Sequence, residues 1–215
     1  MTRAFVVTGT DTGIGKTVAS AALVTLLDGN YWKPIQAGLE GETDRQTVLR
    51  LTGLDETRAP TEAYRLTTPA SPHCAAEIDG ITIDEARLAP PATTRPLIIE
   101  AAGGLLVPIT RKLLQIDLIA GWRLPIVLVA ATRLGTINHT LLSIEALKHR
   151  DMTIAGIVFS GDDNPDTMHT IADFASVSVI GRLPHLDPLD ENTLSVAAHA
   201  HLDIRPFSNV LGDVS

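Results

Sequence analysis

The sequence predicts an α/β fold, in which a mostly parallel β-sheet is flanked by helices on both faces. Short apolar runs rich in Val, Ile and Leu recur along the chain, and most precede an amphipathic segment of helix length, which is typical of βαβ units. The length of 215 residues suits one domain, and no repeat or change of composition marks a second. Residues 1–215 are therefore expected to fold as a single domain with a substantial core.

The predicted strands are apolar runs bounded by Gly, Pro or polar residues, and they span residues 4–9, 31–35, 96–104, 125–131, 154–160 and 177–184. Helical periodicity predicts helices over residues 16–27, about 43–52, 136–150 and 166–175. Residues from about Asp55 to Thr94 are rich in Pro, Thr and Ala with weak periodicity. Long loops with one or two short helices are expected there.

Composition and charge exclude several classes of function. Hydrophobic residues make up 45% of the chain and charged residues 20%, as in soluble globular proteins, and no apolar run is long enough to span a bilayer. The formal net charge of −8 argues against a broad contact with nucleic acid or with a membrane of anionic lipid. Cys74 is the only cysteine, which excludes an internal disulfide and a multi-cysteine zinc site. The N-terminus lacks a secretory leader pattern, and we expect a cytoplasmic protein.

The segment VVTGTDTGIGKT, residues 6–17, joins a predicted strand to a predicted helix. The phosphate-loop pattern G-x-x-x-x-G-K-[ST] requires a glycine where this chain has Thr10, and Gly9 lies one residue too early. The strand–loop–helix context still favours a phosphate loop, one residue longer than usual, and hence a fold like that of P-loop NTPases. A glycine-rich turn without a ligand is the alternative.

In a phosphate loop, backbone N–H groups at the start of a helix converge on phosphate oxygens, assisted by the helix dipole. Lys16 is expected to reach the β- and γ-phosphates, and the Thr17 hydroxyl to coordinate Mg²⁺. Glycines in the loop can adopt positive φ angles. The expected nucleotide-binding residues here are Gly13, Ile14, Gly15, Lys16, Thr17 and Val18.

Three charged residues lie close to predicted strand ends or helix starts. Glu100 ends the apolar run PLIIE, where open parallel sheets expose ligand-binding groups, although a solvated strand end is the alternative. Lys33 lies in YWKPI, although most lysines are merely exposed. Asp44 precedes a helix and is expected to be a cap, a first-turn acid or a metal ligand. Thr17, Asp44 and Glu100, with phosphate oxygens and water, would provide the octahedral oxygen shell of Mg²⁺.

Two other polar clusters are weaker candidates. The loop PASPHCAA brings Ser71, His73 and Cys74 together, but it lacks further zinc ligands and an acid to orient the histidine. Neither a metal site nor a nucleophile is therefore favoured there. The segment RLGTINHTLLS runs from a strand end into a helix that Thr136 is expected to cap, with Asn138 in its first turn.

The motifs GTDTGIGKT, KPIQAG, ASPH, EAAGG and LGTINHTLL occur in an order and spacing that resemble the dethiobiotin synthetase family, over residues 6–192. The phosphate loop is the most specific, because the family's loop carries the same extra residue. The resemblance implies an ATP-dependent ligase of biotin biosynthesis with ATP and Mg²⁺ as cofactors. Such an enzyme joins CO₂ to 7,8-diaminopelargonic acid through a carbamate and a carbamic–phosphoric anhydride, and it releases dethiobiotin, ADP and phosphate.

By resemblance, Lys33 contacts the carbamate and the γ-phosphate, Lys16 stabilises the transferring charge, and Thr12 lies beside both. The three oxygen ligands named above hold Mg²⁺. The family forms homodimers whose substrate site lies at the interface. The implied substrate residues are Lys33, Ala37, Ser71 and Pro72, with Thr136, Ile137 and Asn138 from the partner subunit.

Adenine recognition in the family follows the last strands, and the residues implied here are Ser160, Gly161, Pro184, His185, Leu186 and Glu191. Some positions depart from the family pattern. Ser160 replaces an asparagine that would bond a purine edge, so a relaxed preference among nucleoside triphosphates is expected. Gly13 replaces an acid of some relatives, and Ala37 replaces a serine. Loss of one neutral hydrogen bond, worth about 0.5–1.5 kcal/mol, predicts weaker substrate binding.

Two other families share this style of phosphate loop. Amidation enzymes of cobalamin synthesis carry an additional glutaminase domain, for which 215 residues leave no room. Partitioning and cell-division ATPase switches have a signature lysine five residues before the loop lysine, where this chain has Asp11. Those switches commonly contact DNA or membrane, which an acidic chain without a basic tail does not favour. The ligase interpretation is therefore preferred.

Overall fold

A computed structural model describes residues 3–207. Its centre is a six-stranded sheet with the strand order β2-β5-β1-β6-β7-β8. All neighbouring strands in it are parallel, so their carboxyl ends lie along one edge. The strands are β1 (Ala4–Gly9), β2 (Asn30–Trp32), β5 (Leu97–Gly104), β6 (Ile126–Ala131), β7 (Ile154–Ser160) and β8 (Val179–Leu183).

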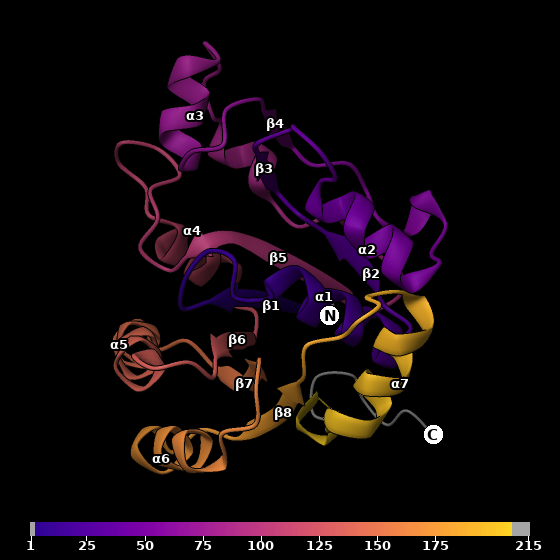
Figure 1. Cartoon of the computed structure of the whole chain (residues 1–215). Helices are drawn as coiled ribbons and strands as arrows, with labels where there is room; N and C mark the ends of the chain where they lie inside the picture. Colours follow the sequence, from indigo (N-terminus) through magenta and orange to yellow (C-terminus); the bar gives the residue numbers. More distant parts are fainter. Residues whose placement is uncertain (1–2, 208–215) are drawn as a thin grey trace.

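Helices cover both faces of this sheet (Figure 1). One face packs against α1 (Lys16–Leu27), α2 (Asp44–Thr52) and α7 (Glu191–His201), and the other against α4 (Gln115–Trp122), α5 (Thr136–Lys148) and α6 (Pro165–Ala175). Alternate residues of β1 enter the two cores, as expected of a strand buried on both faces. The predicted α/β class is confirmed. Within residues 3–207, no helix has the length and apolar character needed to cross a bilayer.

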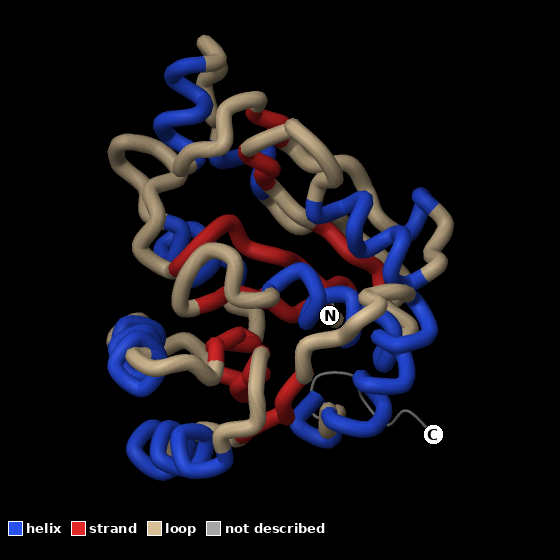
Figure 2. The backbone as a smooth tube through the Cα atoms, in the orientation of Figure 1, coloured by secondary structure: helices blue, strands red, loops and turns tan. Residues whose placement is uncertain are grey.

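A smaller parallel sheet of β3 (Ile35–Ala37) and β4 (Tyr64–Leu66) lies apart from the main one, next to α3 (Pro72–Ile78) (Figures 1 and 2). Short 3₁₀ turns, η1 (Glu56–Arg58) and η2 (Glu85–Leu88), complete this region, and η3 (Arg205–Phe207) follows α7. The short helices expected between residues 55 and 94 are present, but the prediction missed strand β4.

The single strand predicted over residues 31–35 is wrong, because the chain forms two strands there, in different sheets. β2 ends at Trp32 and β3 begins at Ile35. Pro34 lies at the break, since proline has no N–H group to donate to a sheet ladder. Lys33 therefore lies at the junction of the two sheets rather than within one strand.

Helix boundaries also differ from the prediction. Thr43 is the cap of α2 and forms a capping box with Gln46, so Asp44 is a first-turn acid. The predicted cap of α5 is wrong: Gly135, with φ 93°, occupies that position, and Thr136 is the first helical residue. Helices α4 and α7 were not predicted. Their apolar residues are packed by tertiary contacts that the local pattern does not reveal.

Candidate active site

Helix α1 begins directly after the glycine-rich loop. Gly15 occupies its cap position with φ 94°, and Gly13 has φ 71°, a left-handed conformation that favours glycine. No side chain in the described part of the chain caps this helix. The loop therefore presents backbone donors and the positive end of the helix dipole, an arrangement that binds phosphate.

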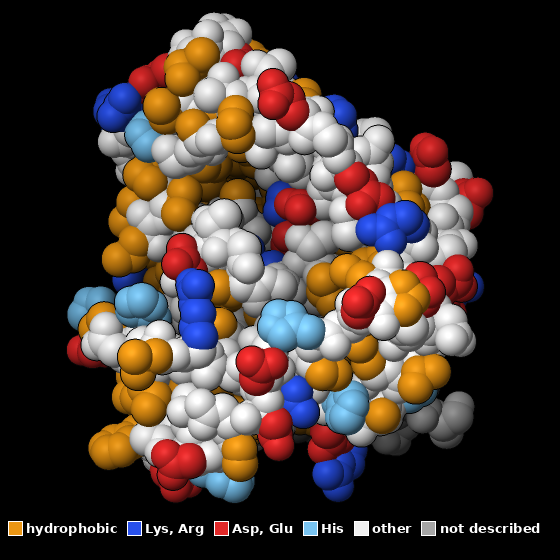
Figure 3. All heavy atoms as spheres, viewed as in Figure 1, with side chains coloured by type: hydrophobic (Ala, Val, Ile, Leu, Met, Phe, Trp, Pro, Cys, Tyr) orange, Lys and Arg blue, Asp and Glu red, His pale blue; other side chains and the backbone are white. Residues whose placement is uncertain are grey.

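Two cavities share this loop as a wall. One, of about 610 Å³, lies over the ends of β6, β7 and β8, and the other, of about 720 Å³, lies between the loop and the β3–α3 region. Gly13, Gly15 and Val18 line both. Figure 3 shows the surface hollowed between the β3–α3 region and the main sheet, with acidic and basic atoms at the wall. An elongated ligand with phosphates on the loop can thus extend into both cavities.

A cluster of charged side chains lies at the 720 Å³ cavity. The Nζ atom of Lys33 lies 2.5 Å from Oδ2 of Asp44 and 2.9 Å from Oε1 of Glu100. The Thr17 hydroxyl lies 3.1 Å from Oδ1 of Asp44 and 3.0 Å from Oε1 of Glu100. Lys33 is 5% exposed and Glu100 is 1% exposed, so water screens the contact between these two residues little. The structure thus brings together four residues that the sequence analysis singled out.

The donor set of this cluster fits a divalent cation. The Thr17 hydroxyl has one hydrogen but two carboxylate neighbours, so one of its two contacts brings oxygens together without a proton between them. The Lys33 ammonium already places a positive charge beside the same two carboxylates, where a metal ion would also bind. Hard oxygens are the ligands that Mg²⁺ prefers. Within residues 3–207, no three or more His, Cys, Asp or Glu side chains are grouped so that they could hold a metal ion. With the three protein oxygens, phosphate oxygens and water would complete an octahedral shell.

Burial and ion pairing shift the pKa values of Lys33 and Asp44 in opposite directions. Burial alone would lower the pKa of Lys33, but the carboxylates of Glu100 and Asp44 outweigh it and raise that pKa above its ordinary value. Burial likewise disfavours the charged form of Asp44, yet the nearby Lys33 ammonium lowers the pKa of this carboxyl below its ordinary value. Lys33 and Asp44 are therefore both charged at neutral pH.

Lys16 is a second buried ammonium beside the cluster. Its Nζ atom donates to the backbone carbonyl of Asp11 at 2.6 Å, so the side chain folds back over the loop. Burial lowers the pKa of Lys16 to about 8, because attraction by Glu100 offsets it only in part and Lys33 repels the charge. A bound anion would favour the charged form again.

Tyr31, which was not predicted from the sequence, also belongs to the cluster. Its side chain is fully buried, and its hydroxyl donates to Oε2 of Glu100 at 2.9 Å. Burial, together with the negative charges of Glu100 and Asp44, raises the pKa of Tyr31 well above its ordinary range, so the phenol stays protonated. A signal was available, because a tyrosine in a buried strand requires a partner for its hydroxyl.

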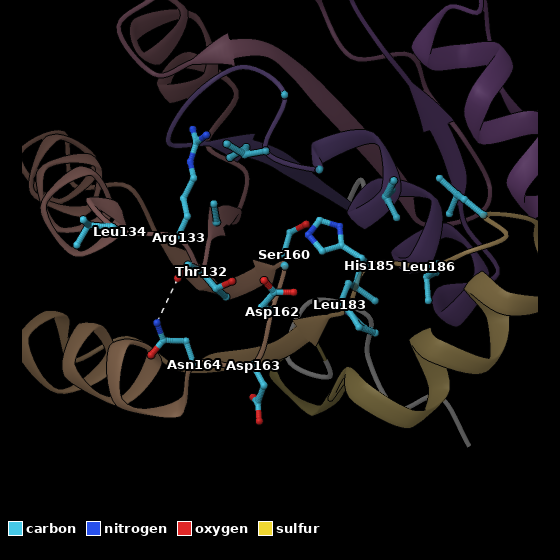
Figure 4. Close-up of a pocket in the computed structure, with 18 residues that line it drawn as sticks. Thr132, Arg133, Leu134, Ser160, Asp162, Asp163, Asn164, Leu183, His185 and Leu186 are labelled. Atoms are coloured by element: carbon cyan, nitrogen blue, oxygen red, sulfur yellow. Dashed lines mark hydrogen bonds between the residues drawn. The ribbon is translucent and has the colours of Figure 1, made fainter.

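The 610 Å³ cavity collects most residues expected around a nucleotide base (Figure 4). The expected residues that line it are Ser160, Gly161, Pro184, His185 and Leu186. Glu191 is not among the lining residues. It starts α7, and its carboxylate lies beside Gly53 at the end of α2. The packing of α7 against α1 and α2 turns this residue away from the cavity.

Polar residues that the sequence analysis did not single out also line this cavity. Asp162, Asp163 and Asn164 follow β7, and Thr132 follows β6. The Asn164 side chain donates to the backbone carbonyl of Thr132 at 3.3 Å, which ties the two strand ends together (Figure 4). The polar run GDDN directly after an apolar strand was the available signal.

The residues expected at the organic substrate fall into two groups. Thr12, Ala37, Ser71 and Pro72 line the 720 Å³ cavity with Lys33. The second group lies at the start of α5, outside that cavity. Thr136 lines a separate cavity of about 270 Å³, Ile137 packs against the core between α5 and α6, and Asn138 is exposed. The single chain does not bring the two groups together.

Comparison with known proteins identifies the family. Residues 3–193 match a family model described as an AAA domain. The curated ATP-dependent dethiobiotin synthetase BioD of Rhodopseudomonas palustris (strain BisA53) is 60% identical over 94% of this chain and 95% of its own length. That of Agrobacterium fabrum is 52% identical over 98% of this chain and 99% of its own length. The chain belongs to the dethiobiotin synthetase family. Dethiobiotin synthetases are ATP-dependent ligases of biotin biosynthesis, and the family expected from the motifs is confirmed.

Solved structures that share the fold include other ATPases. A ParA family ATPase from Chlorobium tepidum has a TM-score of 0.58 at 13% identity, over 92% of this chain and 98% of its own. The MinC:MinD cell division protein complex of Aquifex aeolicus has a TM-score of 0.57 at 13% identity, over 99% and 97%. Such likeness shows the fold alone, and it confirms the P-loop NTPase architecture predicted for this chain.

Substitution of Gly15 tests how tightly the loop packs against the base cavity. A Cβ atom there would lie 2.5 Å from the Ser160 hydroxyl, whereas one at Gly13 would meet nothing within 4 Å. Both glycines have positive φ, which costs another residue about 1–2 kcal/mol. We expect Gly13→Ala to lower the free energy of unfolding in urea by about that amount. Gly15→Ala should lower it by about 1–3 kcal/mol more.

The double variant Gly15→Ala/Ser160→Ala should recover part of the additional loss, because it removes the hydroxyl that the new methyl group meets. Equal losses for the two single variants would contradict the contact.

Proposed function

We propose that this protein catalyses the ATP-dependent carboxylation and ring closure of 7,8-diaminopelargonic acid to dethiobiotin in the cytoplasm. The observation that carries the proposal is the cluster of Thr17, Lys33, Asp44 and Glu100 at a phosphate loop, in a chain 52–60% identical to proteins named dethiobiotin synthetase. The adjoining cavity of about 720 Å³ lies within the usual range of small-molecule sites, about 300–1,000 Å³.

In this proposal, one substrate amine takes up CO₂ as a carbamate and loses a proton. A carbamate oxygen then attacks the γ-phosphorus, ADP leaves, and a carbamic–phosphoric anhydride is formed. The second amine attacks the carbonyl carbon of the anhydride, phosphate leaves with loss of a proton from nitrogen, and the cyclic urea closes. No protein atom forms a covalent bond, so the protein acts by positioning and by neutralising charge.

The roles proposed for individual residues are supported by their places around the loop. The oxygens of Thr17, Asp44 and Glu100 would hold Mg²⁺, which when bound neutralises charge on the β- and γ-phosphates. Lys33, whose ammonium balances the same carboxylates, would contact the carbamate and the γ-phosphate. Lys16 would stabilise the transferring charge from the loop. Thr12, which lines the same cavity, would lie beside both lysines.

The nucleotide base is assigned to the 610 Å³ cavity. Ser160 cannot make the two-sided contact to a purine edge that an asparagine amide makes. Base recognition would therefore depend on backbone groups near Gly161 and Pro184 to Leu186, and on the polar residues after β7. A relaxed preference among nucleoside triphosphates is consistent with the residues that line this cavity.

We also infer a homodimer that completes the substrate site. Leu106, Leu134 and Leu142 are 58%, 104% and 56% exposed, and they border neighbouring cavities that share His139. Exposed apolar side chains gathered on one face are typical of a subunit interface. A partner docked there would bring its residues 136–138 towards the cavity of the first chain.

One assay tests the proposed reaction. Purified protein is mixed with Mg-ATP, bicarbonate and 7,8-diaminopelargonic acid, and phosphate release is followed with and without the diamine. We expect release to depend on the diamine and on bicarbonate, with dethiobiotin as the product. Phosphate release that does not depend on the diamine but increases when DNA or lipid is added would instead support an ATPase switch.

Replacing Lys33 tests its assigned contact with the transferring group. Lys33→Ala should lower diamine-dependent phosphate release by on the order of 10²–10³-fold or more, because it removes a buried charge from the reacting groups. Nucleotide binding, measured by calorimetry with ADP, should remain largely intact. Lys148→Ala is the matched control, since Lys148 bonds the Ala175 carbonyl far from the loop. Near-normal turnover of Lys33→Ala would refute the role.

An interface substitution tests the inferred homodimer. Leu142→Asp should shift the protein to monomers in sedimentation velocity and lower the affinity for the diamine, because a buried carboxylate opposes association. Binding of ADP should not change. Phe174→Asp is the control. Phe174 lies on α6, is 78% exposed, and is not one of the three leucines, Leu106, Leu134 and Leu142, assigned to the interface. A Leu142→Asp protein that sediments like the wild type would contradict this interface.

A further inference from the structure

The buried phenol of Tyr31 divides the two oxygens of Glu100 between different partners. Oε2 accepts from the Tyr31 hydroxyl at 2.9 Å. Oε1 faces the Thr17 hydroxyl at 3.0 Å and the Lys33 ammonium at 2.9 Å. Because Tyr31 is fully buried and Glu100 is 1% exposed, water does not compete for either oxygen. Oε1 therefore faces the Thr17 hydroxyl, a proposed cation ligand, and Oε2 accepts a hydrogen bond from the neutral phenol.

Strand register makes this arrangement rigid. β2 and β5 are parallel neighbours, with Tyr31 opposite Ile98. Alternate residues of a strand share one face, so Glu100 lies on the same face as Ile98 and two residues further along. The long tyrosine ring spans this diagonal separation. Groups held on strands keep their geometry better than groups on loops, so the carboxylate of Glu100 has little freedom to rotate.

Asp44 provides the contrast within the same cluster. Its Oδ1 faces the Thr17 hydroxyl, and its Oδ2 faces the Lys33 ammonium. Its side chain is 32% exposed, whereas that of Glu100 is 1% exposed. The restraint by a buried phenol is thus specific to Glu100.

We propose that Tyr31 makes the cation site selective for Mg²⁺ over larger divalent cations such as Ca²⁺, by leaving Glu100 one available oxygen. The inference rests on the proposed function, in which Thr17, Asp44 and Glu100 hold a cation. Mg²⁺ demands a near-ideal octahedral shell, whereas Ca²⁺ accepts six to eight oxygens and readily uses both oxygens of a carboxylate. Tyr31 is a positioning residue, because it contacts Glu100 and not the cation.

The test measures cation binding by the full chain in complex with a non-hydrolysable ATP analogue. Electron paramagnetic resonance of free Mn²⁺ gives the affinity for that ion, and its displacement by Mg²⁺ or Ca²⁺ gives theirs. Tyr31→Phe is compared with the wild type and with Tyr64→Phe. Tyr64 is the other tyrosine of the chain and is 4% exposed. Its hydroxyl accepts from the Asp84 backbone N–H at 2.7 Å, so Tyr64→Phe controls for loss of a buried phenol hydroxyl.

We expect Tyr31→Phe to weaken Mg²⁺ binding by about 10-fold or more, since partners of ligating side chains typically contribute 10–100-fold. Ca²⁺ binding should weaken much less, because the freed oxygen becomes available to that ion. Tyr64→Phe should change neither affinity. Equal weakening of Mg²⁺ and Ca²⁺ binding by Tyr31→Phe, or no change in either, would overturn the proposal.

Failure of the cation site can be distinguished from failure of the Tyr31 inference. A wild-type complex that binds no Mn²⁺ would refute the cation site and the role of Tyr31 with it. The diamine-dependent release of phosphate tests the proposed reaction separately.

A second measurement does not depend on the stability of a variant at position 31. Wild-type protein labelled with 3-fluorotyrosine has two fluorine positions to observe, and Tyr64→Phe assigns them. Adding Mg²⁺ to the analogue complex should shift the Tyr31 resonance and leave that of Tyr64 in place. An unmoved Tyr31 resonance would overturn the contact between phenol and cation ligand.

Discussion

The site depends on one electrostatic constraint, the balance of charges buried where the two sheets meet. An unpaired buried ion costs several kcal/mol, so Lys33, Asp44 and Glu100 are stable there only as a group. Asp44 and Glu100 contact the Lys33 ammonium directly, and the Lys16 ammonium lies beside them. A cation beside Thr17 would compete with Lys33 for the same carboxylates. Cation binding and the position of Lys33 are therefore one coupled equilibrium in the proposed enzyme.

The fold brings these groups together because the carboxyl ends of its strands lie side by side. Parallel strands place their carboxyl ends along one edge, and the phosphate loop follows β1 at the centre of that edge. The capping box of Thr43 and Gln46 occupies the start of α2, which leaves the Asp44 side chain to face Lys33. The same loop lines both cavities. If the loop binds the phosphates of a nucleotide, the base would lie on one side of these phosphates and the organic substrate on the other.

Local sequence pattern predicted the parts that depend on local physics. β1 and α1 have the predicted bounds, because an apolar run and a Gly-Lys-Thr helix start need no distant partner. The break at Pro34 was missed, since a lysine–proline step in an apolar run is compatible with one strand or two. α7 was missed because its core contacts, including Leu194 and small alanines, become apparent only when the helix packs against α1 and α2. Glu191, which starts that helix, lies outside the lining of the 610 Å³ cavity for the same reason.

Motifs in the sequence marked Thr17, Lys33, Asp44 and Glu100, whereas the partner of the Tyr31 hydroxyl could not be predicted. Glu100 and Tyr31 are separated by 69 residues, and their contact requires the register of β2 on β5. In the sequence, Tyr31 is one of several large apolar residues in a strand. A buried phenol nevertheless needs an acceptor, and here the one it contacts is a carboxylate that a cation would share. In the proposed site, the two carboxylates would attract a cation, and the Tyr31 hydroxyl would limit how many oxygens of Glu100 that cation can contact.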